Sequence, residues 1–237
     1  MKKHMVKLML ISGSLLFFSL PSFSQASFGV KAGVTFTSLQ LTYKNGDKAT
    51  GATVIPGFNA GVTAEFPVWQ NIYVQPGLMY TTKGGKLTGD ADYWFWGDET
   101  DDGDYLKLNA RYIELPLNVI YKYPLGKGKA IGGLGPYVAY GIGGSWRDNY
   151  KGDITKGKLT FDKRFSNIPG DGEPFVYGKK LDIGINVLLG YELTNHLSAT
   201  INGSFGLRNL TPLASDENAT DAKEKNIGGS ISIGYRF

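Results

Sequence analysis

Charged residues recur on the polar side of short alternating segments, where they could pair with one another or line a passage. Four are basic and four are acidic, namely Lys31, Glu65, Arg111, Glu114, Asp182, Glu192, Arg208 and Arg236. A charge buried without a partner is very costly, so charges of both signs on one buried face are expected to form ion pairs. The alternative is that pairs such as Arg111 with Glu114 tune the passage of a solute.

A second candidate site is the acidic and aromatic segment 88–105. Its contact candidates are Tyr93, Trp94, Trp96, Asp98, Asp101 and Asp102. The stretch "DETDDG" suggests calcium, but an EF-hand needs a bidentate acid at its twelfth position, which is Asn109 here. Trp and Tyr are enriched at membrane interfaces, and aromatic residues at binding hot spots. We therefore expect rings that rest on a membrane surface, or an external contact loop, with a looser cation site as a further alternative.

The residues that hydrolases and metalloenzymes most often use are scarce. The chain has 2 His and no Cys. His4 lies in the N-terminal leader, and His196 lies in a short turn without an obvious neighbouring nucleophile. A Ser-His arrangement needs both groups within hydrogen-bond reach, and zinc sites need several ligands of this kind. We predict that the protein is not an enzyme and that it binds no metal or cofactor.

The leader, residues 1–24, has the features of a secretory signal peptide. Three lysines precede an apolar run at 8–20, and small residues follow it. This run is too short for a membrane-spanning helix, which needs about 20 residues. We expect cleavage after Ser24, or alternatively after Ala26, and a mature domain at 25–237.

The overall charge gives no reason to expect a nucleic-acid partner. The sequence pI is about 9.0, with 25 basic and 21 acidic residues. Three of the basic residues are the lysines of the leader, so the mature chain is close to neutral. Nucleic-acid binding depends mainly on a basic excess that neutralises phosphates.

Apolar and polar residues alternate in eight segments of the mature chain, with the period of a β-strand. The segments are 28–36, 57–66, 71–80, 104–122, 130–146, 181–192, 197–208 and 225–237. In 104–122 the apolar positions change parity near Tyr112, which predicts an extra residue there, as a β-bulge provides. The last segment alternates as far as Phe237, so we expect it to pair with the first strand and close the sheet.

The connections between these segments alternate in length. Three are short turns, at 67–71, 124–129 and 193–196, and four are long and polar, at 42–52, 88–103, 147–177 and 210–222. Transmembrane β-barrels have short periplasmic turns and longer external loops. The aromatic residues near the short turns would form an interfacial girdle; they are Phe28, Phe66, Tyr121, Tyr191, Tyr235 and Phe237.

The alternation alone also fits a soluble barrel of lipocalin type, whose apolar side faces inward. The sequence favours a transmembrane barrel over this soluble one. One face of the strands carries charged residues, and the other carries large apolar residues out to the strand ends. We predict an all-β fold, an eight-stranded antiparallel up-and-down transmembrane β-barrel with short periplasmic turns and long external loops. Side chains just fill the interior of such a barrel, so we expect the charge network to plug the lumen.

Three motifs resemble the porin-family outer-membrane β-barrel domain, and within it the PorT-like group of Gram-negative bacteria. They are "FGVKAGVTFTSL" at 28–39, "RYIELPLNVIYKY" at 111–123 and "IGYRF" at 233–237. The resemblance covers almost the whole mature chain. It implies an integral outer-membrane location, insertion by the barrel-assembly machinery, and an assembly signal at Tyr235 and Phe237.

We expect a small barrel with a side-chain-filled lumen and a structural or interaction role at the cell surface. It would contact outer-membrane lipid, and an unknown surface ligand or a secretion-system partner in addition. The alternatives are a narrow porin-like channel for small solutes and a barrel component of a secretion or assembly machine.

Overall fold

The computed structural model describes residues 26–43, 45–89, 103–162, 172–212 and 223–237, so the expected signal peptide lies outside the described residues. The described residues form strands β1 (Ser27–Thr42), β2 (Ala52–Thr53), β3 (Ile55–Trp69), β4 (Ile72–Leu87), β5 (Tyr105–Leu125), β6 (Gly128–Tyr150), β7 (Asp153–Phe161), β8 (Phe175–Gly178), β9 (Leu181–Leu193), β10 (Leu197–Gly206) and β11 (Lys223–Arg236). No helix among these residues has the length and apolarity to cross a membrane.

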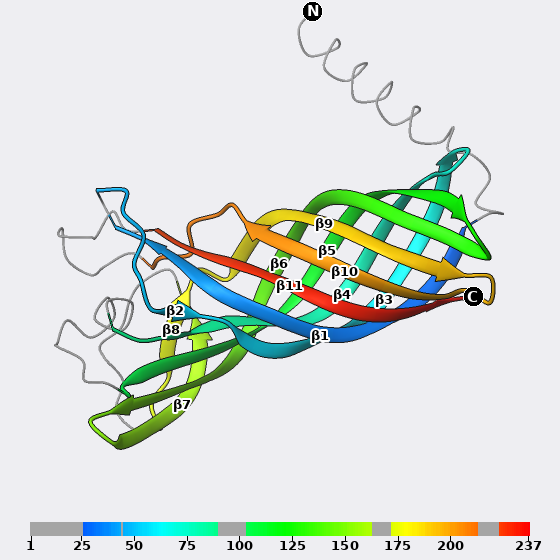
Figure 1. The fold of residues 1–237 in the computed structure, drawn as a ribbon. Helices are drawn as coiled ribbons and strands as arrows, with labels where there is room; N and C mark the ends of the chain where they lie inside the picture. Colours follow the sequence, from blue (N-terminus) through cyan, green and yellow to red (C-terminus); the bar gives the residue numbers. More distant parts are fainter. Residues whose placement is uncertain (1–25, 44, 90–102, 163–171, 213–222) are drawn as a thin grey trace, which may run out of the picture.

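Eight of the strands form a closed antiparallel ring, as predicted (Figure 1). The order around the ring is β1, β3, β4, β5, β6, β9, β10 and β11, and β11 pairs again with β1. Val30 lies opposite Tyr235 in this closing pair, and Phe237 donates its backbone N–H to the carbonyl oxygen of Phe28 at 2.8 Å. The C-terminal segment is thus paired on both sides.

The expected long connection at 147–177 is only partly a loop. β6 continues to Tyr150, a tight hairpin follows, and β7 pairs with it from Asp153 to Leu159. β8 pairs with β7 in parallel, and the two-residue β2 pairs with β4. Figure 1 shows β7 and the adjoining part of β6 extending from the ring at the end away from the chain's C-terminus.

Short turns join the strands at one end of the ring. Two residues separate β3 from β4, two separate β5 from β6, and three separate β9 from β10. Gly126 and His196 have positive φ angles of 59° and 66° in the second and third of these turns. Tight hairpin turns often require such a left-handed residue. The longer connections lie at the opposite end, so the predicted alternation of short turns and long loops is confirmed.

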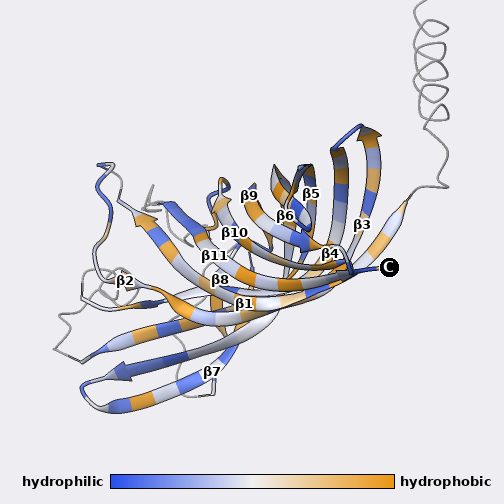
Figure 2. Ribbon diagram, turned by 45° about the vertical axis from the view of Figure 1, so that its right-hand side comes forward, coloured by the Kyte–Doolittle hydropathy of each residue, from blue (hydrophilic) through white to orange (hydrophobic). Residues whose placement is uncertain are grey.

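Large apolar side chains cover the outside of the ring. In the ribbon of Figure 2, hydrophobic and hydrophilic residues alternate along the strands. The exposed side chains include Phe28, Val34, Phe58, Leu78, Leu117, Leu134, Val187, Leu189, Ile201, Ile233, Tyr235 and Phe237. Exposed apolar surface on this scale is exceptional in soluble monomers. The belt is the lipid-facing surface of a transmembrane barrel.

The register shift lies between Arg111 and Tyr112, near the predicted position, but β5 keeps a single parity and does not itself carry the extra residue. Even-numbered residues of β5 point inward along the whole strand, from Leu106 and Leu108 to Asn118 and Lys122. The apolar residues change face because the surroundings change. At the external end the interior is an apolar core and the outside faces water, whereas further along the interior is polar and the outside faces lipid.

The extra residue lies on the neighbouring strand. Arg111 pairs with Gly143 and Tyr112 pairs with Gly141, so Ile142 of β6 has no direct partner on β5. Inward positions of β6 are odd-numbered before this point and even-numbered after it, as Tyr137 and Trp146 illustrate. Gly143 has a φ of +130°, which a residue with a side chain rarely adopts.

An apolar core fills the external end of the ring. Its members from the ring and from β7 and β8 include Leu39, Leu41, Leu87, Leu106, Leu108, Tyr112, Trp146, Leu159, Phe161, Phe175 and Tyr177, and each is at most 7% exposed. Phe161 meets the rings of Tyr112 and Tyr177 edge to face, with centroids 5.2 and 5.6 Å away. Packing of this kind fills the interior of the ring beside β7 and β8.

Deletion of Tyr235–Phe237 is expected to abolish stable insertion. The deletion removes backbone partners of both β1 and β10, and an unpaired backbone group in lipid costs several kcal/mol. Heat-modifiable gel migration measures the folded fraction. The single change Tyr235→Phe retains the backbone and the ring, and it serves as the control. Wild-type amounts of the heat-modifiable form after the deletion would contradict the role of this closing pair.

Single cysteines should report the two ends of the barrel, because the chain has no cysteine of its own. Asp153→Cys lies beside the β6–β7 hairpin, and Lys127→Cys lies in the short β5–β6 turn. We expect a membrane-impermeant maleimide to label the first variant on intact cells and the second only after the outer membrane is permeabilised. The reverse pattern would invert the topology.

Candidate functional site

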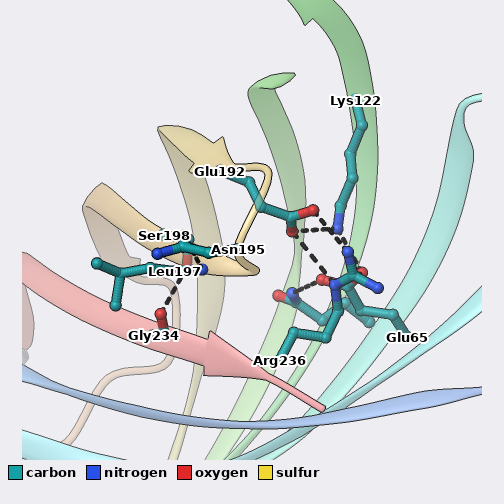
Figure 3. A network of polar contacts seen from close by, with 9 residues as sticks. Glu65, Lys122, Glu192, Asn195, Leu197, Ser198, Gly234 and Arg236 are labelled. Atoms are coloured by element: carbon teal, nitrogen blue, oxygen red, sulfur yellow. Dashed lines mark hydrogen bonds and ion pairs between the residues drawn. The ribbon is translucent and has the colours of Figure 1, made fainter. Parts of the chain in front are cut away.

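Two groups of ion pairs lie inside the ring, and the first is near the short turns (Figure 3). The Lys122 ammonium is 2.5 Å from Glu65 Oε2 and 2.7 Å from Glu192 Oε2. The Arg236 guanidinium donates to Glu192 Oε1 at 2.7 Å. The Lys122 side chain is only 2% exposed, so these contacts form in a site shielded from water.

The strand ring positions these four side chains as one layer. They come from β3, β5, β9 and β11, which are alternate strands around the ring. Inward-pointing residues of alternate strands commonly form layers in closed barrels. Gln75 of β4 adds a hydrogen bond to Glu65 Oε1 at 3.0 Å. Together these residues form a polar layer across the interior of the ring near the short turns.

The second group is centred on Lys83 of β4. Its ammonium is 2.8 Å from Glu114 Oε2 and 3.1 Å from Asp182 Oδ2, and it lies 4.0 Å from the centre of the Tyr137 ring. The Tyr137 hydroxyl and the Asn226 amide also donate to Asp182 Oδ2, at 3.3 and 3.1 Å. A buried carboxylate with several donors is held firmly, and its charge is compensated locally.

A small polar cavity of about 60 Å³ lies beside the Lys83 group. Its walls include Lys31, Thr35, Asn59, Thr81 and Asn186. A second cavity of about 40 Å³ lies beside Arg236 and shares Lys31 as a wall. The larger space has room for about four water molecules. These cavities can hydrate the interior, but each is much smaller than a ligand site of about 300 Å³ or more.

The structure places six of the eight charged candidates inside the ring and two outside it. Those inside are Lys31, Glu65, Glu114, Asp182, Glu192 and Arg236. Arg111 occupies an outward position of β5, because its parity is opposite to that of Glu114. Arg208 is exposed and lies beyond the end of β10 at Gly206, where strand alternation no longer applies. Expecting these two side chains in the lumen was wrong.

Sequence reasoning missed Lys83 and Lys122, the central cation of each group. Lys83 shares the parity of Gln75 and Met79, but it lies beyond the segment 71–80 that was assigned to the strand. Lys122 lies eight residues after Glu114 on the same face of β5. Following the period of two beyond Tyr80 would have found Lys83, whereas Lys122 already lies within the predicted segment 104–122, on the face opposite to Tyr121.

The other candidates do not form a site among the described residues. His196 is exposed in the turn between β9 and β10. In the part of the chain that the structure describes, no group of three or more His, Cys, Asp and Glu residues could hold a metal ion. The contact candidates Tyr93, Trp94, Trp96, Asp98, Asp101 and Asp102 lie outside the described residues.

Comparisons with known proteins point to one family. The profile of the family described as "Outer membrane protein beta-barrel domain" matches residues 21–211. No curated protein matches the chain. The PorT-like group therefore stays a prediction.

Three of the similar solved structures illustrate the likeness, each at low sequence identity. Ail, the attachment invasion locus protein of Yersinia pestis, is 10% identical, with 90% of this chain and 99% of that chain covered and a TM-score of 0.37. OprG from Pseudomonas aeruginosa is 15% identical, with 90% and 96% covered and a TM-score of 0.44. Neisserial surface protein A is 14% identical, with 90% and 98% covered and a TM-score of 0.39.

Lys122→Met is expected to destabilise the barrel by about 3 kcal/mol or more, because it removes the buried cation that Glu65 and Glu192 share. Urea unfolding of the refolded protein in lipid vesicles measures this loss. Lys127→Met, an exposed lysine on the adjacent turn, should change stability by less than about 0.5 kcal/mol. Adding Glu65→Gln to Lys122→Met should restore part of the stability. Equal stability of Lys122→Met and wild type would show that the ion pairs contribute nothing.

Proposed function

The chain belongs to the outer membrane protein beta-barrel domain family, and we propose that its lumen is closed by side chains and that it has a structural or interaction role at the cell surface. It is an integral outer-membrane protein, and its apolar belt contacts the lipid of that membrane. The layer formed by Glu65, Lys122, Glu192 and Arg236 is the observation that carries the proposal.

Closure is supported at three depths. The four-residue layer crosses the lumen near the short turns, the Lys83 group crosses it further along, and the apolar core fills the external end. Opening a path would require the separation of Lys122 from two carboxylates in a shielded site, which is strongly unfavourable. The two lumen cavities that the described residues form, of about 60 and 40 Å³, leave little room for a hydrated solute. The geometry therefore favours a plug over the alternative of a narrow channel.

The external end supports the interaction part of the proposal. β5, β6 and β7 continue beyond the apolar belt and present a folded surface outside the membrane. The connection between β4 and β5 leaves the same end of the barrel, and it contains the contact candidates around Trp94 and Trp96. We propose these residues as an additional external contact, since aromatic residues are common at binding hot spots.

The N-terminal leader belongs to the same proposal. Residues 1–24 would direct export and be removed, and residues 25–237 would form the barrel domain. The outer-membrane location supports this division, because the chain must cross the inner membrane before it is inserted. The barrel-assembly machinery would be its partner during insertion.

The purified protein in planar bilayers should show no steady ion conductance, because the three layers interrupt the lumen. A general porin inserted into the same bilayers is the positive control, and heat-modifiable migration verifies that the test protein is folded. A reproducible open state of porin-like size in the wild-type protein would refute the plug and favour the channel.

A further inference from the structure

Four cations form one row across the external ends of four neighbouring strands. The register places Lys86 of β4 opposite Lys107 of β5, Lys107 opposite Arg147 of β6, and Arg147 opposite Lys156 of β7. Like charges directly opposite each other on paired strands are destabilising. An anionic group beside Lys86, Lys107 and Arg147 would therefore relieve the repulsion within this row.

The row belongs to a larger basic face on the outside of the barrel. Arg111 and Lys158 occupy outward positions of β5 and β7 between the row and the apolar belt. Three acidic residues of this region are buried. Asp104 precedes β5, Glu114 lies on β5, and Asp148 lies on β6. No ion pair joins Lys86, Lys107 or Arg147 to a carboxylate among the described residues. Cations and carboxylates are thus sorted to opposite faces of the same strands.

The basic face is hollowed. An open depression of about 670 Å³ is lined by Lys86, Tyr105, Lys107, Asn109, Ser145, Trp146, Arg147, Lys156 and Gly157. The Lys86 ammonium lies 4.3 Å from the centre of the Tyr105 ring, which orients it at one edge of the depression. Its volume is in the range of pockets that hold drug-sized ligands. A phosphorylated sugar headgroup is of this size.

The height of the face matches the headgroup layer of the outer leaflet. Ile113 of β5 and Ile142 of β6 are the last outward apolar residues before the external end of their strands. A tilted strand rises by about 2.5 Å per residue along the membrane normal, which places Arg111 about 5 Å and Lys107 about 15 Å above Ile113. Cations at both depths face sideways, toward lipid headgroups that surround the barrel.

We propose that this basic face binds the phosphate groups of the phosphorylated glycolipid, lipopolysaccharide, in the outer leaflet. Lys and Arg form charge-assisted hydrogen bonds with phosphate oxygens, and basic clusters beside a membrane-spanning segment attract anionic headgroups. A glycolipid is favoured over a soluble polyanion because the face is continuous with the apolar belt. One molecule can therefore place its acyl chains on the belt and its phosphates on the row.

The test measures glycolipid binding by the folded mature protein in phosphatidylcholine nanodiscs at physiological salt. The probe is fluorescent lipopolysaccharide of the deep-rough type, with a dephosphorylated preparation in parallel. Lys107→Ser with Arg147→Ser should weaken binding of the phosphorylated probe about thirtyfold. Wild type should bind the dephosphorylated probe as weakly as this double variant binds the phosphorylated one.

Lys223→Ser with Lys225→Ser is the matched control. These lysines lie at the external end of β11, across the ring from β5, and their replacement removes the same charge. Binding should then change by about twofold at most, because salt screens charges at that distance. The exchange Lys107→Arg with Arg147→Lys should retain binding. Heat-modifiable migration confirms that each variant is folded.

Three results would overturn the proposal. The first is equal binding by wild type and by the Lys107→Ser, Arg147→Ser variant, and the second is equal binding of the two glycolipid preparations by wild type. The third is tighter binding of a soluble polyphosphate than of the phosphorylated glycolipid, which would assign the face to a ligand outside the membrane. None of these results depends on the closure of the lumen.

Discussion

Closure of the strand ring is the constraint on which the rest of the structure depends. Lipid offers no hydrogen-bond partner to a backbone group, so a β-structure in a membrane must satisfy all of its backbone within the sheet. β11 meets this condition by pairing with β10 on one side and with β1 on the other. Once the ring is closed, the alternation of each strand divides the molecule into an outside and a lumen. The ion pairs, the apolar belt and the basic face all follow from that division.

The division has opposite chemical consequences at the two ends of the barrel. In the lipid zone the outward positions are apolar and the lumen is polar, so Lys122 points inward with its carboxylates. Beyond the lipid the outside meets water and headgroups, and an apolar core fills the interior around Leu106 and Leu108. One strand, β5, makes both arrangements without a change of parity. Its charged residues lie on whichever face is not apolar.

Sequence alone predicted the eight ring strands and the ring closure, because period-two alternation is strong wherever one face meets hydrocarbon. The sequence was misread at β5, where the apolar residues move from one face of the strand to the other. A bulge in the strand and a change in what surrounds it both produce this pattern, and a single strand does not distinguish them. The register shift opposite Ile142 becomes visible only when β5 and β6 are paired. β7 and β8 were missed because their segment is polar on its outer face, and their buried residues pack on a core that other strands supply.

The sequence predicted that the site would consist of ion pairs inside the barrel, but it did not identify the two lysines at the centre of those pairs. Carboxylates such as Glu65 and Asp182 stand out because few acids occur on the alternating segments, whereas Lys83 and Lys122 lie near strand ends, where a lysine is usually solvated. Lys122 is buried near the short turns and Lys83 further along the lumen, because inward-facing carboxylates of other strands compensate both charges. Lys107 faces outward because its parity on β5 is opposite to that of Lys122. The parity of each lysine on its strand therefore decides whether it joins the ion pairs of the lumen or remains outside, where it can meet an anionic surface.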